Sequence, residues 1–236
     1  MTHLFRDVDG DCLCPNGSVV CIGAFDGLHL GHRALVDRAV SRARELGVES
    51  VALSFEPLPR EFFAPDSRPA RLSLPRAKFE DLRALGVDRV GLLRFNACMA
   101  AMSADDFIDR VLVQRLRARE VWVGPGFRFG NRRAGDLSLL RASGEKNAFV
   151  ANEIERVSID GERISSSNIR ALLAAGDLEA AARLLGRPYA IAGTVVRGNQ
   201  LGRTLGYSTA NVRLAGKLPA VDGIFATRVH AVGLDD

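Results

Sequence analysis

Apolar runs alternate with amphipathic segments along most of this chain. Residues 18–22 (Ser-Val-Val-Cys-Ile) form a short, nearly continuous apolar run, which predicts a buried strand. Residues 32–46 then carry apolar side chains at helical spacing, including Leu35, Val36 and Ala39. The pattern predicts a strand that leads almost directly into a helix.

The same alternation continues to residue 185. We expect further strands at 49–55, 88–94 and 120–123, an extended segment at 147–151, and helices at 75–85, 103–116, 134–143, 167–175 and 178–185. Ser103 is the expected N-cap of its helix. Alternating strands and helices predict an α/β fold with a doubly wound parallel sheet, which binds ligands at the carboxyl ends of its strands.

The pattern changes at Gly186-Arg187-Pro188. Residues 189–196 and 223–232 have strand composition, with a glycine-rich loop between them and no helical periodicity. We therefore expect two domains, residues 1–187 and residues 188–236, the second being the start of an antiparallel β domain.

A glycine-rich segment, residues 23–32, joins the first strand to the first helix. Gly23, Gly27 and Gly31 allow the backbone to approach a ligand closely, and the free N–H groups of the helix attract anions. His29 and His32 lie three residues apart, so both can donate hydrogen bonds to one polyphosphate. A histidine is more often structural or solvated, but this loop position favours a phosphate site.

A second candidate anion site lies at residues 163–170, where an extended segment enters a helix. Arg163 precedes three serines, and Ser166 or Ser167 would cap the helix. The arginine, the hydroxyls and the free helix N–H groups together would also suit a triphosphate.

Three further features admit both a functional and a plain structural interpretation. A long proline-containing loop after residue 55 carries aromatic rings that would bind a planar ligand or form a small core of their own. Residues 124–130 are a glycine- and phenylalanine-rich loop at the expected ligand edge of the sheet. Thr209 and Asn211 offer oxygen ligands for Mg²⁺, although their spacing alone favours a polar turn.

Composition limits the class of protein. The net charge is +4, and only three of the 32 basic residues are lysine, so arginine is spread along the chain without the basic tail typical of nucleic-acid binding. The four cysteines show no Cys-x-x-Cys pair, which indicates reduced thiols and no zinc site. Because no apolar signal region or membrane-length window is present, we expect a cytoplasmic protein with no membrane partner.

Over nearly all of residues 15–232 the chain resembles the prokaryotic bifunctional riboflavin kinase/FMN adenylyltransferase (FAD synthetase) family. The resemblance implies that His29 and His32 are phosphate-contacting catalytic residues, joined by Arg163 and Ser166 from the second motif. It further implies an ATP site and a flavin site, with Thr209 and Asn211 on the magnesium motif of the kinase module. The implied ATP-binding residues are Gly23, Ala24, Phe25, Asp26, Gly31 and Ser165, and the implied flavin-binding residues are Phe55, Pro57, Phe62 and Phe129.

By this resemblance the chain would make FAD and pyrophosphate from FMN and ATP with Mg²⁺, and riboflavin would be the substrate of the kinase module. Gly126 and Ser208 depart from the family pattern, and the sequence given stops at Asp236, ahead of the segments that hold the catalytic glutamate of the kinase. We therefore expect no kinase activity from this chain, and residues beyond about 189 either mobile or docked on the first domain or another chain.

Two alternatives stay open. The first is another nucleotidyltransferase of the same fold, acting on pantetheine phosphate or nicotinamide mononucleotide. The second is a protein that binds flavin or nucleotide without turnover. Self-association is also open.

Overall fold

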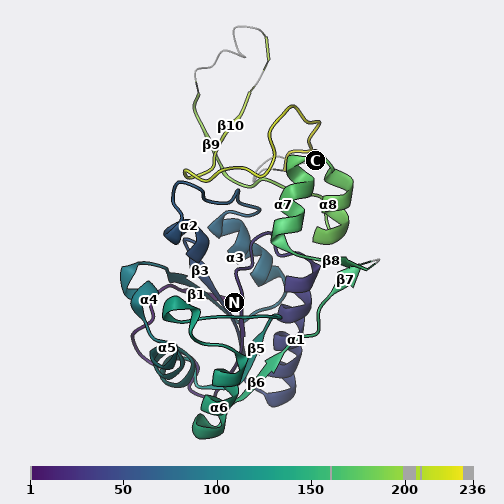
Figure 1. Ribbon diagram of the computed structural model, residues 1–236. Coiled ribbons are helices and arrows are strands. Elements are labelled where there is room, and N and C mark those ends of the chain that lie inside the picture. The colour runs from purple at the N-terminus through teal and green to yellow at the C-terminus, as the bar shows by residue number, and fades with distance from the viewer. Residues whose placement is uncertain (1, 160, 199–205, 208, 231–236) are drawn as a thin grey trace.

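The computed structural model describes residues 2–159, 161–198, 206–207 and 209–230 (Figure 1). Six strands form one sheet in the order β1-β4-β3-β2-β5-β6, and every neighbouring pair is parallel. The strands are β1 (His3–Phe5), β2 (Ser18–Ile22), β3 (Glu49–Glu56), β4 (Arg89–Arg94), β5 (Ala118–Val123) and β6 (Val150–Glu153). The expected doubly wound parallel sheet is confirmed.

Both faces of the sheet are covered, as the continuous apolar run of β2 requires. Val19 and Cys21 face a core shared with α1 (Leu30–Leu46) and α3 (Pro75–Ala84). Val20 and Ile22 face the opposite core. That core is shared with α5 (Ala104–Phe107), the π-helix η1 (Ile108–Arg115) and α6 (Leu137–Asn147), and α4 (Ala97–Ala101) adds Met99 to it. Successive side chains of a strand point to opposite faces, so one short run fills both cores.

The direction of the chain through the sheet reverses between β2 and β5. From β2 the chain moves outward through β3 to β4, and it then returns to the other side of β2 to form β5 and β6. Neighbouring strands whose connections leave in opposite directions open a crevice at their carboxyl ends. The segments that follow β2 and β5 are residues 23–32 and 124–130, both of which were predicted as ligand loops.

Several expected elements differ in extent. The helix expected at 103–116 begins after Ser103, which caps it as predicted, but it continues as a π-helix from Ile108. The helix expected at 134–143 starts later, because the Asp136 side chain accepts a hydrogen bond from the Leu139 N–H and caps it there. The sequence also gave no sign of β1, of α2 (Pro59–Phe63) inside the proline-containing loop, or of α4.

Beyond β6 the chain forms a small subdomain above the carboxyl edge of the sheet (Figure 1). It comprises the hairpin β7 (Ser158–Ile159) and β8 (Glu162–Arg163), followed by α7 (Ser166–Ala174) and α8 (Leu178–Leu185). The buried faces of α7 and α8 share a third core with Leu72 and Ala220.

The β segment beyond residue 187 is less regular than expected. β9 (Thr194–Val196) and β10 (Asn211–Arg213) pair antiparallel, but residues 223–230 form no strand, so the expectation there is wrong. Residues 231 and 232 of that expected strand, and Ser208, lie outside the described residues. Ile224 and Val229 are exposed and have no neighbouring strand among the described residues, and strand composition alone does not make a strand.

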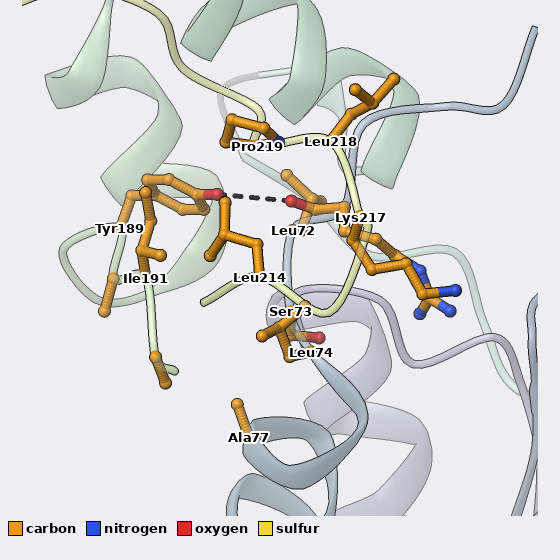
Figure 2. A pocket seen from close by; sticks show the side chains of 13 residues that line it. Leu72, Ser73, Leu74, Ala77, Tyr189, Ile191, Leu214, Lys217, Leu218 and Pro219 are labelled. Atoms are coloured by element: carbon orange, nitrogen blue, oxygen red, sulfur yellow. Dashed lines mark hydrogen bonds between the residues drawn. The ribbon is translucent and has the colours of Figure 1, made fainter. Parts of the chain in front are cut away.

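Residues 214–220 dock on the first domain, which is one of the arrangements expected from the sequence. The Arg71 N–H donates to the Leu218 carbonyl at 2.8 Å, and the Tyr189 hydroxyl donates to the Arg71 carbonyl at 3.4 Å. Figure 2 shows the small hollow that results, with Tyr189 and Leu214 on one side and Leu72 on the other. Within the described part of the chain, none of the helices is long and apolar enough to cross a membrane.

Candidate functional site

The glycine-rich loop between β2 and α1 has an unusual backbone. Phe25 and Leu28 adopt the left-handed region with φ of 46° and 44°, which is rare for bulky residues and typical of functional loops. Gly27 has φ of 83°, and a Cβ there would lie 2.8 Å from the Leu72 side chain. A Cβ on Gly23 would lie 2.9 Å from the Phe25 ring. The glycines therefore allow the loop to pack tightly against its surroundings.

His29 and His32 form a stacked pair at the start of α1. Their ring centroids are 3.7 Å apart with an interplanar angle of 12°, and the Phe25 ring meets His32 edge-on at 5.4 Å. His29 is the N-cap of α1, because its Nδ1 accepts a hydrogen bond from the His32 N–H at 3.2 Å. The first turn of α1 holds no acidic side chain, so the positive end of the helix is left for an external anion.

Both imidazoles are neutral near pH 7. Burial lowers the pKa of His29 to about 4. Burial, together with the charge of Lys78 and repulsion from His29 whenever that ring is protonated, holds the pKa of His32 well below its usual range. Because His29 Nδ1 acts as an acceptor, its proton must sit on Nε2, which is thus a hydrogen-bond donor. His32 Nδ1 is buried and lacks a hydrogen-bond partner among the described residues, a costly state that is typical of ligand sites.

Asp26 holds the loop in place from within the protein. Its side chain is 1% exposed and accepts hydrogen bonds from the Leu72 and Ser73 N–H groups at 3.2 and 3.0 Å. It also pairs with Arg170 of α7 at 2.6 Å. The carboxylate of Asp26 is thus engaged by protein groups and supports the loop, and the predicted role of Asp26 in ATP binding stays a prediction.

The structure brings the two predicted anion motifs together. The Ser166 hydroxyl donates to the Asp26 carbonyl at 3.0 Å, across 140 positions of sequence. Ser165 caps α7 by accepting from the Asn168 N–H at 3.2 Å, so the expected cap at Ser166 or Ser167 is wrong by one or two residues. Arg163 lies on β8 with an exposed side chain.

Three of the predicted flavin residues belong to one connected group of aromatic rings, although they come from three segments. Phe95 links Phe55 and Phe62, at centroid distances of 5.8 and 5.4 Å. Phe107 links Phe55 to Phe129, at 6.3 and 5.7 Å. Phe129 is buried and Phe62 is partly exposed. The fourth predicted residue, Pro57, follows a cis peptide bond at the end of β3 and is partly exposed.

Sequence reasoning missed the linking rings Phe95 and Phe107, the partly buried Arg170 and the buried Lys78. Lys78 is fully buried and donates to the Ala24 carbonyl at 2.8 Å. A signal for Lys78 was present, because the chain has only three lysines and this one lies on the apolar face of a helix. Arg170 closes the Arg163–Arg170 motif, but nothing local in the sequence pairs it with Asp26.

The described residues contain no group of three or more His, Cys, Asp or Glu side chains able to hold a metal ion. Thr209 and Asn211, the candidate magnesium ligands, are both exposed, and Asn211 lies on β10. Their hydroxyl and amide oxygens are of the kind that Mg²⁺ accepts, but two such groups fill only part of its coordination shell.

Comparisons with known proteins show to which family the chain is similar. The FAD synthetase family profile matches residues 13–168, and the riboflavin kinase profile matches residues 185–234. A bifunctional riboflavin kinase/FMN adenylyltransferase of Pseudomonas fluorescens is 44% identical, over 92% of this chain and 70% of its own length. The protein of the same description from Escherichia coli K12 is 42% identical, over 92% of this chain and 69% of its own length.

A solved structure from Streptococcus pneumoniae, described as a macrolide-efflux protein, is also similar. It has a TM-score of 0.74 and 30% sequence identity, and the match covers 94% of this chain and 72% of that one. The likeness supports the same overall fold.

The depressed pKa of His29 makes stability depend on pH. In the unfolded chain His29 has the ordinary pKa of 6.5, so as pH falls from about 6.5 to about 4 the unfolded state takes up a proton that the folded state refuses. We expect this group alone to remove about 3 kcal/mol of stability across that interval. His29→Asn keeps a capping acceptor but does not titrate, so denaturant unfolding of this variant should show a weaker pH dependence than the native chain.

The exposed His3 provides a matched control, because His3→Asn removes a histidine outside the site. Equal pH dependence in the native chain and in His29→Asn would show that the buried imidazole is not held neutral.

Proposed function

The chain belongs to the FAD synthetase family, and from that membership we propose that it transfers the adenylyl group of ATP to FMN, giving FAD and pyrophosphate. The observation that carries this proposal is the stacked pair of neutral imidazoles at the start of α1. The pair lies at the carboxyl end of β2, where the sheet reverses direction and nucleotides bind in such folds.

The site suits a reaction that needs positioning and charge stabilisation. An oxygen of the FMN phosphate attacks the α-phosphorus of ATP, and the bond from that phosphorus to the bridging oxygen breaks, so the electron pair leaves with pyrophosphate. Nε2–H of His29, the His32 imidazole and the N–H groups of α1 would hold the phosphate oxygens as charge moves. Arg163 and Ser165 would extend this cradle from the second motif.

Mg²⁺ is part of the proposal, because it would neutralise the triphosphate charge when bound. The described residues offer no carboxylate cluster for it, so the ion would arrive with the nucleotide. We also propose a cytoplasmic location, which the four free cysteine thiols favour.

The aromatic group favours flavin over the alternative acceptors. Phe55, Phe62 and Phe129 are joined through ring contacts, and Phe63 next to them is 66% exposed. Partly exposed rings at and after the carboxyl end of β3 suit a planar apolar ring system such as isoalloxazine. Pantetheine phosphate has no such ring system, and the ring of nicotinamide mononucleotide is smaller.

We expect His29→Ala and His32→Ala each to slow FAD formation from FMN and ATP by about ten- to a thousandfold, the usual effect of losing a transition-state donor. Chromatography of FMN and FAD with the folded variants measures the rate. His29→Asn separates the capping role of His29 from its role as a donor, and His3→Ala is the control. Native turnover in both alanine variants would contradict the phosphate role.

We expect Phe62→Ala to weaken FMN binding while the affinity for ATP stays largely unchanged, because Phe62 is partly exposed and belongs to the aromatic group. Phe129 is buried, so Phe129→Leu, which conserves much of its volume, is the better variant there. Calorimetric titration with each ligand is the measurement. Phe149→Leu, in the same core but with no ring contact to this group, is the control. Unchanged FMN affinity in both test variants would assign these rings to the core alone.

For the kinase module we propose that Thr209 and Asn211 mark its magnesium and ATP motif. We also propose that this module begins after residue 187, where the first domain ends. A kinase barrel needs a closed apolar interior, whereas Val195 and Ile224 are exposed in the described part of this segment. We therefore expect the purified 236-residue chain to make no FMN from riboflavin and ATP while it makes FAD from FMN. Chromatographic detection of FMN would overturn this expectation.

A further inference from the structure

Lys78 is the most unusual side chain that the reaction described above leaves without a role. It lies on α3 with 0% exposure, and a buried ammonium is costly unless it is well hydrogen-bonded. Its Nζ donates to the Ala24 carbonyl at 2.8 Å and to the Ser54 hydroxyl oxygen at 3.1 Å. The Ser54 hydroxyl in turn donates to the Ala24 carbonyl at 2.9 Å. Two donors therefore converge on one carbonyl of the glycine-rich loop at residues 23–32, which carries His29 and His32 and is called the histidine loop below.

That carbonyl sits immediately before one of the two left-handed non-glycine residues of the loop. Phe25 has a left-handed backbone with φ of 46°, is fully buried, and meets the His32 ring edge-on at 5.4 Å. A residue in this region of φ and ψ stays there only if its neighbours fix it. Lys78 and Ser54 fix the preceding peptide. The path from Lys78 to His32 therefore consists of one hydrogen bond to the Ala24 carbonyl, the Ala24–Phe25 peptide and one ring contact.

The charge of Lys78 also acts on the site. Burial, with a smaller contribution from the charge of Arg71, lowers the pKa of Lys78 to about 8, and the charges of Glu56, Asp26 and Glu61 oppose the shift. Lys78 thus stays largely protonated at pH 7. Among the described residues no carboxylate comes within ion-pair distance of it, and its charge is one of the influences that keep His32 neutral.

We propose that Lys78 is a positioning residue for adenylyl transfer, which holds the Ala24 carbonyl and through it the Phe25 ring against His32. This inference rests on the proposed function. An ordinary core lysine would act on stability alone, because removing one partner of a buried hydrogen bond costs folding free energy without altering the reaction. A positioning lysine must instead change the reaction and the environment of His32.

The kinetic test compares Lys78→Met, which conserves length and removes the charge, with Ser54→Ala, which removes one of the two donors to Ala24. We expect Lys78→Met to lower kcat by about ten- to a hundredfold, as a small displacement of a catalytic group does, with KM for ATP and FMN nearly unchanged. Ser54→Ala should have a smaller effect of the same kind. The exposed Lys146 gives the matched control Lys146→Met, which should keep native kinetics.

A second readout does not depend on turnover. The imidazole of His32 is titrated by NMR in the native chain, in Lys78→Met and in Ser54→Ala. Loss of the Lys78 charge should raise the pKa of His32, and Ser54→Ala should alter the chemical shift of its ring without removing that charge. If Lys78→Met does not fold, Ser54→Ala alone decides, through its kcat and its His32 shift.

Native kcat together with an unchanged His32 signal in the folded variants would overturn the positioning role. A native chain that makes no FAD from FMN and ATP would instead contradict the proposed function. In that case the NMR comparison still decides whether Lys78 positions the histidine loop.

Discussion

The ion pair between the buried Asp26 and the partly buried Arg170 is the contact on which the candidate site depends. Asp26 lies in the loop after β2, and Arg170 lies on α7, 144 positions later. The same carboxylate accepts N–H groups of residues 72 and 73, so one buried charge joins three separate segments. A buried charge left without its partner is strongly destabilising, typically by about 3–5 kcal/mol. The pair therefore keeps the second anion motif close to the first.

The surroundings of the histidine loop keep both imidazoles unprotonated, so the loop offers neutral hydrogen-bond donors to a ligand. Desolvation keeps His29 and His32 neutral, and the nearby ammonium of Lys78 acts on His32 in the same direction. Meanwhile the N-terminus of α1 is free of acidic side chains. Such a site attracts a polyphosphate through dipoles and N–H groups that are already in place, which is how a preorganised site lowers the barrier of phosphoryl chemistry.

Local patterns in the sequence predicted the parallel sheet, most helices and the histidine loop, because strand runs, helical periodicity and glycine spacing are properties of short segments. The partners of that loop are not local. Arg170 and Lys78 reach it from α7 and α3, and only the folded chain shows that they meet Asp26 and Ala24. The strand expected over residues 223–230 is absent because its composition was the only evidence for it. A segment of β composition forms a strand only where a neighbouring strand can pair with it.

The most direct test of the central claim is a crystal structure of the chain with FMN and an ATP analogue whose α–β bridge cannot be cleaved. The triphosphate should lie within hydrogen-bond distance, about 3 Å, of His29 Nε2 and of the His32 ring, with its oxygens at the first N–H groups of α1. The flavin should lie against the aromatic group around Phe62. A nucleotide that binds elsewhere and leaves both imidazoles without a phosphate contact would contradict the claim.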